Sequence, residues 1–194
     1  MDQTKTIELQ KSFSSKGIFP HQMAFTLLIP LRNIFLSPRK LIQQIELKED
    51  HTVLELGPGP GYFSLPVARY LNKGKIVLAD IQPEMLEYAQ KRARKRRLTN
   101  IEYYQCYGNT FDLADNCFDR IYMITVMGEV ENKHSYLNEI HRMLKNNGIV
   151  SFSEQAGDPD KMSIEEIKEL MNQHGFTFDR LYGNSKNYTI NFRK

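Results

Sequence analysis

The residues with the clearest potential for chemistry are two carboxylates on either side of a glycine-rich segment. The segment reads Val53-Leu-Glu-Leu-Gly-Pro-Gly-Pro-Gly-Tyr-Phe-Ser64, with Glu55 two residues before the first glycine, and Asp80 ends the next apolar run. Glycine is needed where the backbone takes unusual dihedral angles or approaches a ligand closely. A helix that starts after such a turn offers unpaired N–H groups. These features predict a binding site for a small molecule at the turn.

The spacing and the charges discriminate between possible ligands. A dinucleotide loop reads G-x-G-x-x-G and leaves room for a pyrophosphate, whereas Gly57, Gly59 and Gly61 stand at alternate positions. A carboxylate at Glu55 would repel a pyrophosphate but could hold an ammonium group, directly or through water. Asp80 could accept hydrogen bonds from both hydroxyls of a ribose. This combination favours S-adenosylmethionine, which carries an ammonium, a sulfonium and a ribose but no phosphate, and it opposes a nicotinamide dehydrogenase.

Strand and helix signals alternate from about residue 37 onward. Ser37-Pro38 and Pro83 mark helix starts, Asn147-Gly148 is a helix stop, and Ser163-Ile-Glu-Glu166 matches a capping box. Short β-branched and apolar runs between them predict buried strands. The expected strands are His51–Leu56, Lys75–Ala79, Ile101–Cys106, Arg120–Val126, Ile149–Ser153, Phe176–Tyr182 and Tyr188–Phe192.

This alternation predicts a three-layer α/β fold with a doubly wound, seven-stranded sheet that is mostly parallel. The last two strands form a hairpin around Gly183-Asn184-Ser185, so we expect an antiparallel last strand at the edge of the sheet. The length of 194 residues suits one domain. We assign residues 37–194 to that domain. Residues 1–36 show no regular hydrophobic periodicity, and we interpret them as a segment that could form a lid over the substrate.

Five segments in order resemble the class I, Rossmann-like S-adenosylmethionine-dependent methyltransferases, and the resemblance covers the chain from about residue 37 to its end. The glycine segment matches the family's first motif and Asp80 its second acidic position. The other three are Tyr107-Gly108-Asn109-Thr110, Asp119–Val126 and Arg142-Met-Leu-Lys-Asn-Asn-Gly148. Two departures are Asn109 in place of the usual aspartate and Asn147 in place of a glycine.

The resemblance implies S-adenosylmethionine as the cofactor and a set of residues around it. Ile81 would pack on the adenine, Asn109 would meet the adenine edge, and the end of the fourth strand at Thr125 would border the transferred methyl group. No metal site is expected. The residues expected to bind the cofactor are Glu55, Gly57, Pro58, Gly59, Gly61, Tyr62, Asp80, Ile81, Asn109, Thr110 and Thr125.

The methyl acceptor is harder to predict, because a sulfonium is already activated and the protein mainly aligns the nucleophile and removes water. His21 and Glu129 are the substrate-side candidates for a catalytic base. The segment Thr125-Val-Met-Gly-Glu129 lacks the Asn/Asp-Pro-Pro-Tyr/Phe pattern of many amino-group methylases. We therefore expect a small-molecule acceptor at nitrogen, oxygen or carbon. An RNA or protein methyltransferase, or a non-catalytic S-adenosylmethionine-binding protein, remains the alternative.

The composition limits the kinds of binding partner and the cellular compartment that we expect for this protein. A net charge of +3 does not by itself indicate a nucleic-acid partner, and we interpret the basic run at residues 91–97 as the solvated side of an amphipathic helix. The apolar stretch Met23–Leu36 contains Pro30 and Arg32 and is too short to span a membrane. Two cysteines make no disulfide framework, so we expect the cytoplasm. The oligomeric state stays open.

Overall fold

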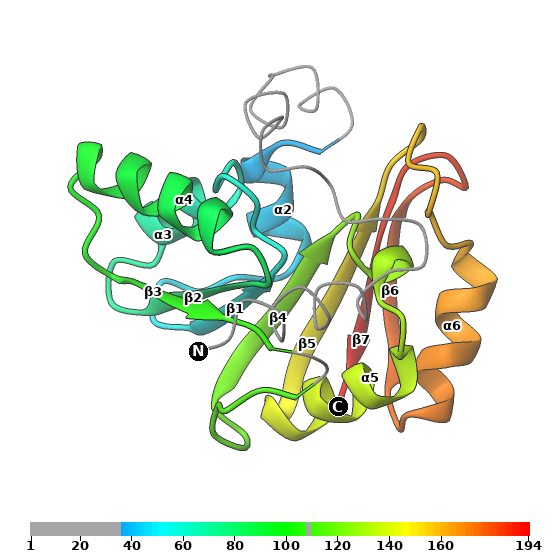
Figure 1. The fold of residues 1–194 in the computed structure, drawn as a ribbon. Helices are drawn as coiled ribbons and strands as arrows, with labels where there is room; N and C mark the ends of the chain where they lie inside the picture. The colour runs from blue at the N-terminus through cyan, green and yellow to red at the C-terminus, as the bar shows by residue number, and fades with distance from the viewer. Residues whose placement is uncertain (1–35, 108–109) are drawn as a thin grey trace.

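The chain forms one seven-stranded sheet in the order β3-β2-β1-β4-β5-β7-β6 (Figure 1). The structure is a computed structural model that describes residues 36–107 and 110–194. Residues 1–35 of the predicted lid, which include the candidate base His21, and the adenine-edge residue Asn109 lie outside these described residues. The strands are β1 (Thr52–Leu56), β2 (Lys75–Asp80), β3 (Ile101–Gln105), β4 (Phe118–Ile124), β5 (Leu144–Glu154), β6 (Thr177–Gly183) and β7 (Tyr188–Arg193).

Strands β1 to β5 run parallel to one another, and β7 is antiparallel to both of its neighbours, β5 and β6, which confirms the predicted mostly parallel sheet. The expected position of the antiparallel strand at the edge is wrong, because β7 lies between β5 and β6. The difference follows from burial. All but the last residue of β7 are buried, whereas β6 is largely exposed and carries Asp179 and Arg180. Charged side chains suit an edge strand, so β6 takes that position.

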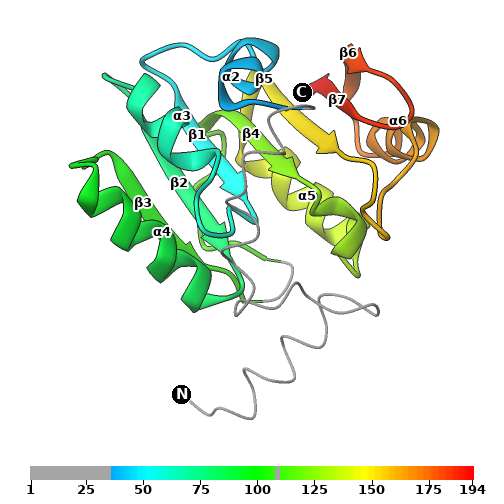
Figure 2. The same cartoon turned by 90° about the horizontal axis from the view of Figure 1, so that it is seen from above.

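Helices cover both faces of the sheet (Figure 2). Ser37 accepts a hydrogen bond from the Lys40 backbone N–H and caps the first helix, and Ser163 with Glu166 forms the expected capping box. The helices α2 (Pro38–Gln44), α3 (Ser64–Tyr70) and α4 (Pro83–Lys95) lie on one face, and α5 (Lys133–Met143) and α6 (Ile164–Gln173) on the other.

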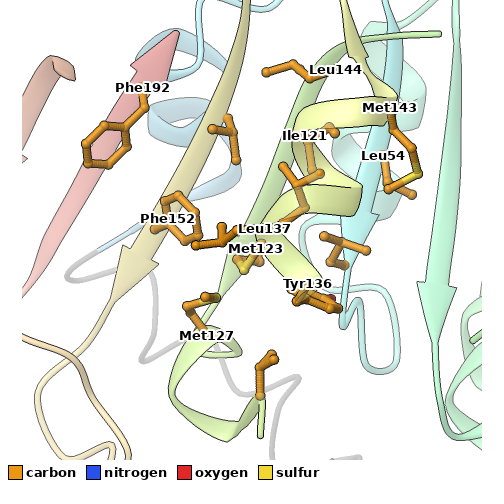
Figure 3. Close-up of a cluster of buried hydrophobic side chains, with 14 of the residues drawn as sticks. Leu54, Ile121, Met123, Met127, Tyr136, Leu137, Met143, Leu144, Phe152 and Phe192 are labelled. Carbon is orange, nitrogen blue, oxygen red and sulfur yellow. The ribbon is translucent and has the colours of Figure 1, made fainter. Parts of the chain in front are cut away.

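Two apolar cores separate these layers. The larger core packs α5 and α6 against the sheet, where Leu137 and Met143 of α5 meet Ile121 of β4 and Phe152 of β5 (Figure 3). The second core packs the other three helices on the opposite face of β1, β2 and β4. The buried apolar residues of β1, β2 and β4 are divided between the two cores, so these central strands are buried on both sides, as expected for a parallel sheet.

The basic run belongs to an amphipathic helix, as predicted. Met85, Leu86, Ala89 and Ala93 form the buried side of α4. Arg92 donates a hydrogen bond to the backbone oxygen of Pro60, so part of the positive charge serves the packing of α4 against the glycine turn.

One element boundary differs from the prediction. Strand β5 begins at Leu144, directly after α5 ends at Met143, and runs through Asn147-Gly148, the expected helix stop. Asn147 adopts a positive φ of 64°. The break expected at Asn147-Gly148 therefore lies within the first residues of β5 and not between the helix and the strand. No helix among residues 36–107 and 110–194 is long and apolar enough to cross a membrane.

Candidate cofactor-binding site

A cavity of about 750 Å³ opens at the carboxyl ends of β1, β2, β4 and β5. Its wall includes the glycine turn after β1, the end of β2, the end of β4 and the loop Gln155–Asp160 after β5. The chain order of the strands reverses between β1 and β4, and the crevice at such a switch point is where open α/β sheets bind ligands.

The glycine turn is built for close approach of the backbone. Gly57 has a φ of +66°, and a Cβ atom there would lie 2.5 Å from Cγ2 of Val126. The Gly57 N–H donates to the backbone oxygen of Ala79 at 2.9 Å, which ties the turn to the end of β2. Gly61 serves a different contact, because a Cβ atom there would lie 3.2 Å from Cβ of Ala89 in α4. The first glycine shapes the turn and the last allows close helix packing.

Asp80 joins the glycine turn to the turn after β2. Its Oδ2 accepts a hydrogen bond from the Gly59 N–H at 3.3 Å, and its Oδ1 accepts one from the Gln82 N–H at 3.0 Å. The side chain is buried, and this burial raises the pKa of Asp80 to about 6. A carboxylate held in this way keeps a fixed orientation toward the cavity wall, with lone pairs remaining for a ligand.

Glu55 lies at the floor of the cavity and has a partner that the sequence analysis missed. The Tyr122 hydroxyl donates to Oε2 of Glu55 at 2.8 Å, and both residues are fully buried. Burial raises the pKa of the Glu55 carboxyl to about 7. The signal for this pair is strand register, because Tyr122 stands opposite Glu55 in the β1–β4 ladder. That register was not available before the strand order was known.

Thr125 directly follows β4 and has a backbone conformation that is unusual for a β-branched residue. Its φ is 55°, although a β-branched residue rarely adopts a positive φ. Its N–H donates to the backbone oxygen of Ser153 at 2.8 Å, which holds the turn against β5. Backbone strain of this kind costs on the order of 1–3 kcal/mol and clusters at functional sites. Thr125 lines the cavity, so the strain lies at the site.

Glu129 closes the far side of the cavity. It ends a short 3₁₀ turn, η3 (Met127–Glu129), that packs against the loop after β5. A Cβ atom at Gly128 would lie 1.8 Å from the carbonyl oxygen of Asp160, so the two segments are in direct contact. Burial raises the pKa of Glu129 to about 7, and the nearby carboxylates of Asp158, Asp160 and Asp80 add to the increase.

The structure brings most of the predicted residues to the same cavity. Gly61 and Thr110 do not line the cavity; Thr110 pairs instead with Tyr107 in a short antiparallel bridge. The predicted residues that line it are Glu55, Gly57, Pro58, Gly59, Tyr62, Asp80, Ile81, Thr125 and Glu129. The cavity is also lined by residues that the sequence analysis did not assign to the site, from the neighbouring strands, helices and loops: Pro60, Phe63, Ala79, Gln82, Met85, Cys106, Ile124, Val126, Val130, Tyr136 and residues 155–160.

The fold and the cavity together define the class of protein. The strand order, the antiparallel β7, the glycine turn and the acids at the ends of β1 and β2 are those of a Rossmann-like methyltransferase. The model of the methyltransferase domain family matches residues 47–188. The chain belongs to this family, and its cofactor is S-adenosylmethionine.

Individual relatives agree with the family assignment. The chain is similar to the ubiquinone/menaquinone biosynthesis C-methyltransferase UbiE of Haemophilus ducreyi, with 31% identity over 135 residues, covering 67% of this chain and 49% of that protein. UbiE of Blochmanniella pennsylvanica is 33% identical over 127 residues, covering 63% and 48%. The chain therefore spans about half the length of the UbiE relatives it matches.

Among solved structures, a SAM-dependent methyltransferase from Aquifex aeolicus superimposes with a TM-score of 0.85 at 25% identity, covering 90% of this chain and 98% of that one. A putative S-adenosyl-L-methionine-dependent methyltransferase from Methanococcus maripaludis has a TM-score of 0.73 at 20% identity, covering 90% of each chain, and shows the same fold.

The raised pKa of Glu55 makes a prediction about pH. If Glu55 holds the cofactor's ammonium group, binding requires the ionised carboxylate. Above about pH 7 Glu55 is already ionised in the free protein, so affinity should be nearly constant. Below that pH a proton must leave on binding, and the affinity for S-adenosylhomocysteine should fall, approaching about tenfold per pH unit. Calorimetric titrations between pH 5.5 and 8.5 measure this dependence.

The matched variant for this prediction is Glu55→Gln, which keeps the shape and an oxygen for Tyr122 but does not titrate. Asp80, whose pKa is raised to about 6, leaves a dependence that begins at lower pH than that of Glu55. The variant should therefore bind more weakly at pH 8 and lose the part of the pH dependence near pH 7. An unchanged profile in Glu55→Gln would assign the titration to another group.

Proposed function

We propose that the protein transfers the methyl group of S-adenosylmethionine to a small-molecule acceptor. One observation carries the proposal: a single cavity contains Glu55 and Asp80 beside the glycine turn and continues past Thr125 to Glu129. The first part suits the charges and hydroxyls of the cofactor, and the second leaves room for an acceptor next to the strained end of β4. A mostly apolar pocket with a few polar groups is the usual form of such a site.

The roles of the residues follow from their positions. Glu55 would hold the cofactor's ammonium group, Asp80 would accept hydrogen bonds from the ribose hydroxyls, and Ile81 would pack against the adenine. When bound, the cofactor supplies an electrophilic methyl group on a sulfonium. The protein's contribution is to bind and orient both partners and to exclude water, which converts a bimolecular reaction into one between fixed neighbours.

A second candidate function is methylation of a quinone-type ring carbon. The similarity to UbiE C-methyltransferases favours it. A small-molecule acceptor is common to both candidates. We also propose the cytoplasm as the location, in keeping with free thiols at Cys106 and Cys117.

Calorimetry tests the cofactor half of this proposal. S-adenosylhomocysteine should bind and NAD should not bind tightly, because a pyrophosphate placed at the glycine turn would meet the Glu55 carboxylate. Transfer of label from methyl-tritiated S-adenosylmethionine to a panel of amines, phenols and hydroxyl compounds tests the catalytic half. Preferential binding of NAD would refute the proposal, and cofactor binding without transfer to any acceptor would favour a non-catalytic binding protein.

A further inference from the structure

The carboxylate of Glu55 is held by a side chain that does not line the cavity. The Tyr122 hydroxyl donates to Oε2 of Glu55 at 2.8 Å. Glu55 is one of the residues that line the cavity, whereas Tyr122 lies behind it in the middle of β4 and is completely buried. Tyr122 would therefore act on a bound cofactor through Glu55 and not by direct contact.

The register of β1 and β4 brings these two side chains together. Tyr122 stands opposite Glu55 in the parallel ladder, so both side chains point to the same face of the sheet. On that face the ring of Tyr122 belongs to the apolar core beneath α2, α3 and α4. Because protein cores are closely packed, a ring in this position has little room to turn. The core therefore presents the hydroxyl to Glu55 from a fixed direction.

Polar side chains from three elements act on the Glu55 carboxyl. The hydroxyls of Tyr122 in β4 and Ser64 in α3 favour its ionised form, whereas the carboxylate of Asp80 in β2 disfavours it. Burial has the largest effect and raises the pKa of Glu55 to about 7. No ion pair joins Glu55 to a lysine, arginine or histidine of the described ranges. The two hydroxyls therefore stabilise the charge of Glu55 until a ligand supplies a cation.

The hydrogen bond from Tyr122 leaves acceptor sites for a second partner. An ionised carboxylate has two oxygens and about four acceptor sites, and Tyr122 uses one of them on Oε2. Burial also raises the pKa of the Tyr122 hydroxyl well above its usual range, so the hydroxyl stays protonated and remains a donor near neutral pH. The remaining sites of Glu55 are available to an ammonium group in the cavity.

We propose that Tyr122 is a positioning residue for S-adenosylmethionine, because its hydroxyl holds the Glu55 carboxylate as the acceptor for the cofactor's ammonium group. The inference rests on the proposed function, in which Glu55 binds that group. Tyr122 and Glu55 then act as one unit on the amino-acid part of the cofactor. Asp80 and Ile81 hold the nucleoside part, and Tyr122 has no influence on that part.

Calorimetry with two ligands separates the amino-acid part of the cofactor from its nucleoside part. S-adenosylhomocysteine carries the ammonium group, whereas 5′-methylthioadenosine keeps the adenosine and the thioether but has no amino acid. Tyr122→Phe removes the donor and raises the pKa of Glu55 further, so more carboxyls are protonated before binding. At pH 6 the affinity for S-adenosylhomocysteine should fall about tenfold, the factor that corresponds to one hydrogen bond to a charged group. The loss should shrink toward pH 9, and binding of 5′-methylthioadenosine should stay unchanged.

Tyr70→Phe is the matched control. The Tyr70 hydroxyl also donates a hydrogen bond, to the backbone oxygen of Leu47 at 3.2 Å, but Tyr70 ends α3 and does not line the cavity. This variant should keep the wild-type affinity for both ligands at every pH. Site-specific replacement of Tyr122 by 3-fluorotyrosine gives the opposite change, because the fluorinated hydroxyl is more acidic and is a stronger donor. It should move the fall in S-adenosylhomocysteine affinity to lower pH, and it decides the question even if Tyr122→Phe does not fold.

The double variant tests whether Tyr122 acts through Glu55. Adding Tyr122→Phe to Glu55→Gln should cause little further loss of S-adenosylhomocysteine affinity, because the two residues act as one unit. A full additional loss overturns the inference. An unchanged ratio of the two affinities in Tyr122→Phe, or an equal loss for both ligands, also overturns it and leaves the proposed function intact. Failure of S-adenosylhomocysteine to bind the wild type overturns both.

Discussion

Replacing Asp80 by alanine should weaken the binding of S-adenosylhomocysteine about tenfold to a hundredfold. Hydrogen bonds to a charged group are worth about 1.5–3 kcal/mol, and about 1.4 kcal/mol corresponds to one decade of affinity. Asp80 also accepts hydrogen bonds from the Gly59 and Gln82 backbone N–H groups. The substitution therefore removes both an acceptor for the ribose and an anchor of the glycine turn. Calorimetry at pH 8, where Asp80 is ionised, measures the loss.

Two further variants separate these contributions. Asp80→Asn keeps one acceptor oxygen and the side-chain volume, so its affinity should lie between those of the wild type and Asp80→Ala. Glu87→Ala removes an exposed carboxylate from α4, outside the cavity, where Glu87 pairs with Lys91. It should bind like the wild type. If a folded Asp80→Ala protein retains the wild-type dissociation constant, Asp80 does not contact the ribose.

A methyl group at Gly128 should destabilise the protein by about 3 kcal/mol, at or above the upper end of the usual range for overpacking. The new Cβ atom would lie 1.8 Å from the carbonyl oxygen of Asp160 and 2.7 Å from its carbonyl carbon. Because the obstacle is backbone rather than a flexible side chain, the contact can be relieved only if η3 and the loop after β5 move apart. That movement opens the cavity wall, so affinity for S-adenosylhomocysteine should fall as well.

Gly157→Ala is the control from the same loop. Nothing lies within 4 Å of a Cβ atom there, although its φ is +90°. It carries only the backbone cost of a left-handed alanine, on the order of 1–2 kcal/mol. Urea denaturation of the two variants should rank Gly128→Ala as clearly the less stable. Equal stabilities would mean that η3 and the loop are not packed as described.

Several features were predictable because they depend on local chemistry. The start of α2 at Ser37-Pro38 and the capping box of Ser163 and Glu166 use hydrogen bonds between residues three positions apart. The strand β1 and the glycine turn could be predicted from an apolar run that ends in glycines, because hydrophobic periodicity and glycine content can be seen in the sequence itself. Glu55 and Asp80 could be placed at one edge because parallel strands end together.

Tertiary structure alone decided the remainder. The antiparallel strand β7 lies inside the sheet because it is buried, whereas β6 is largely exposed. Which of the two strands takes the edge depends on comparing them, and neither strand's own sequence settles it. Tyr122 donates to Glu55 only because β4 pairs beside β1. The acidic end of the cavity forms because the loop after β5 folds onto η3, which brings Asp158 and Asp160 to Glu129. Pairing, burial and mutual charge depend on which distant segments meet, and no local pattern specifies that.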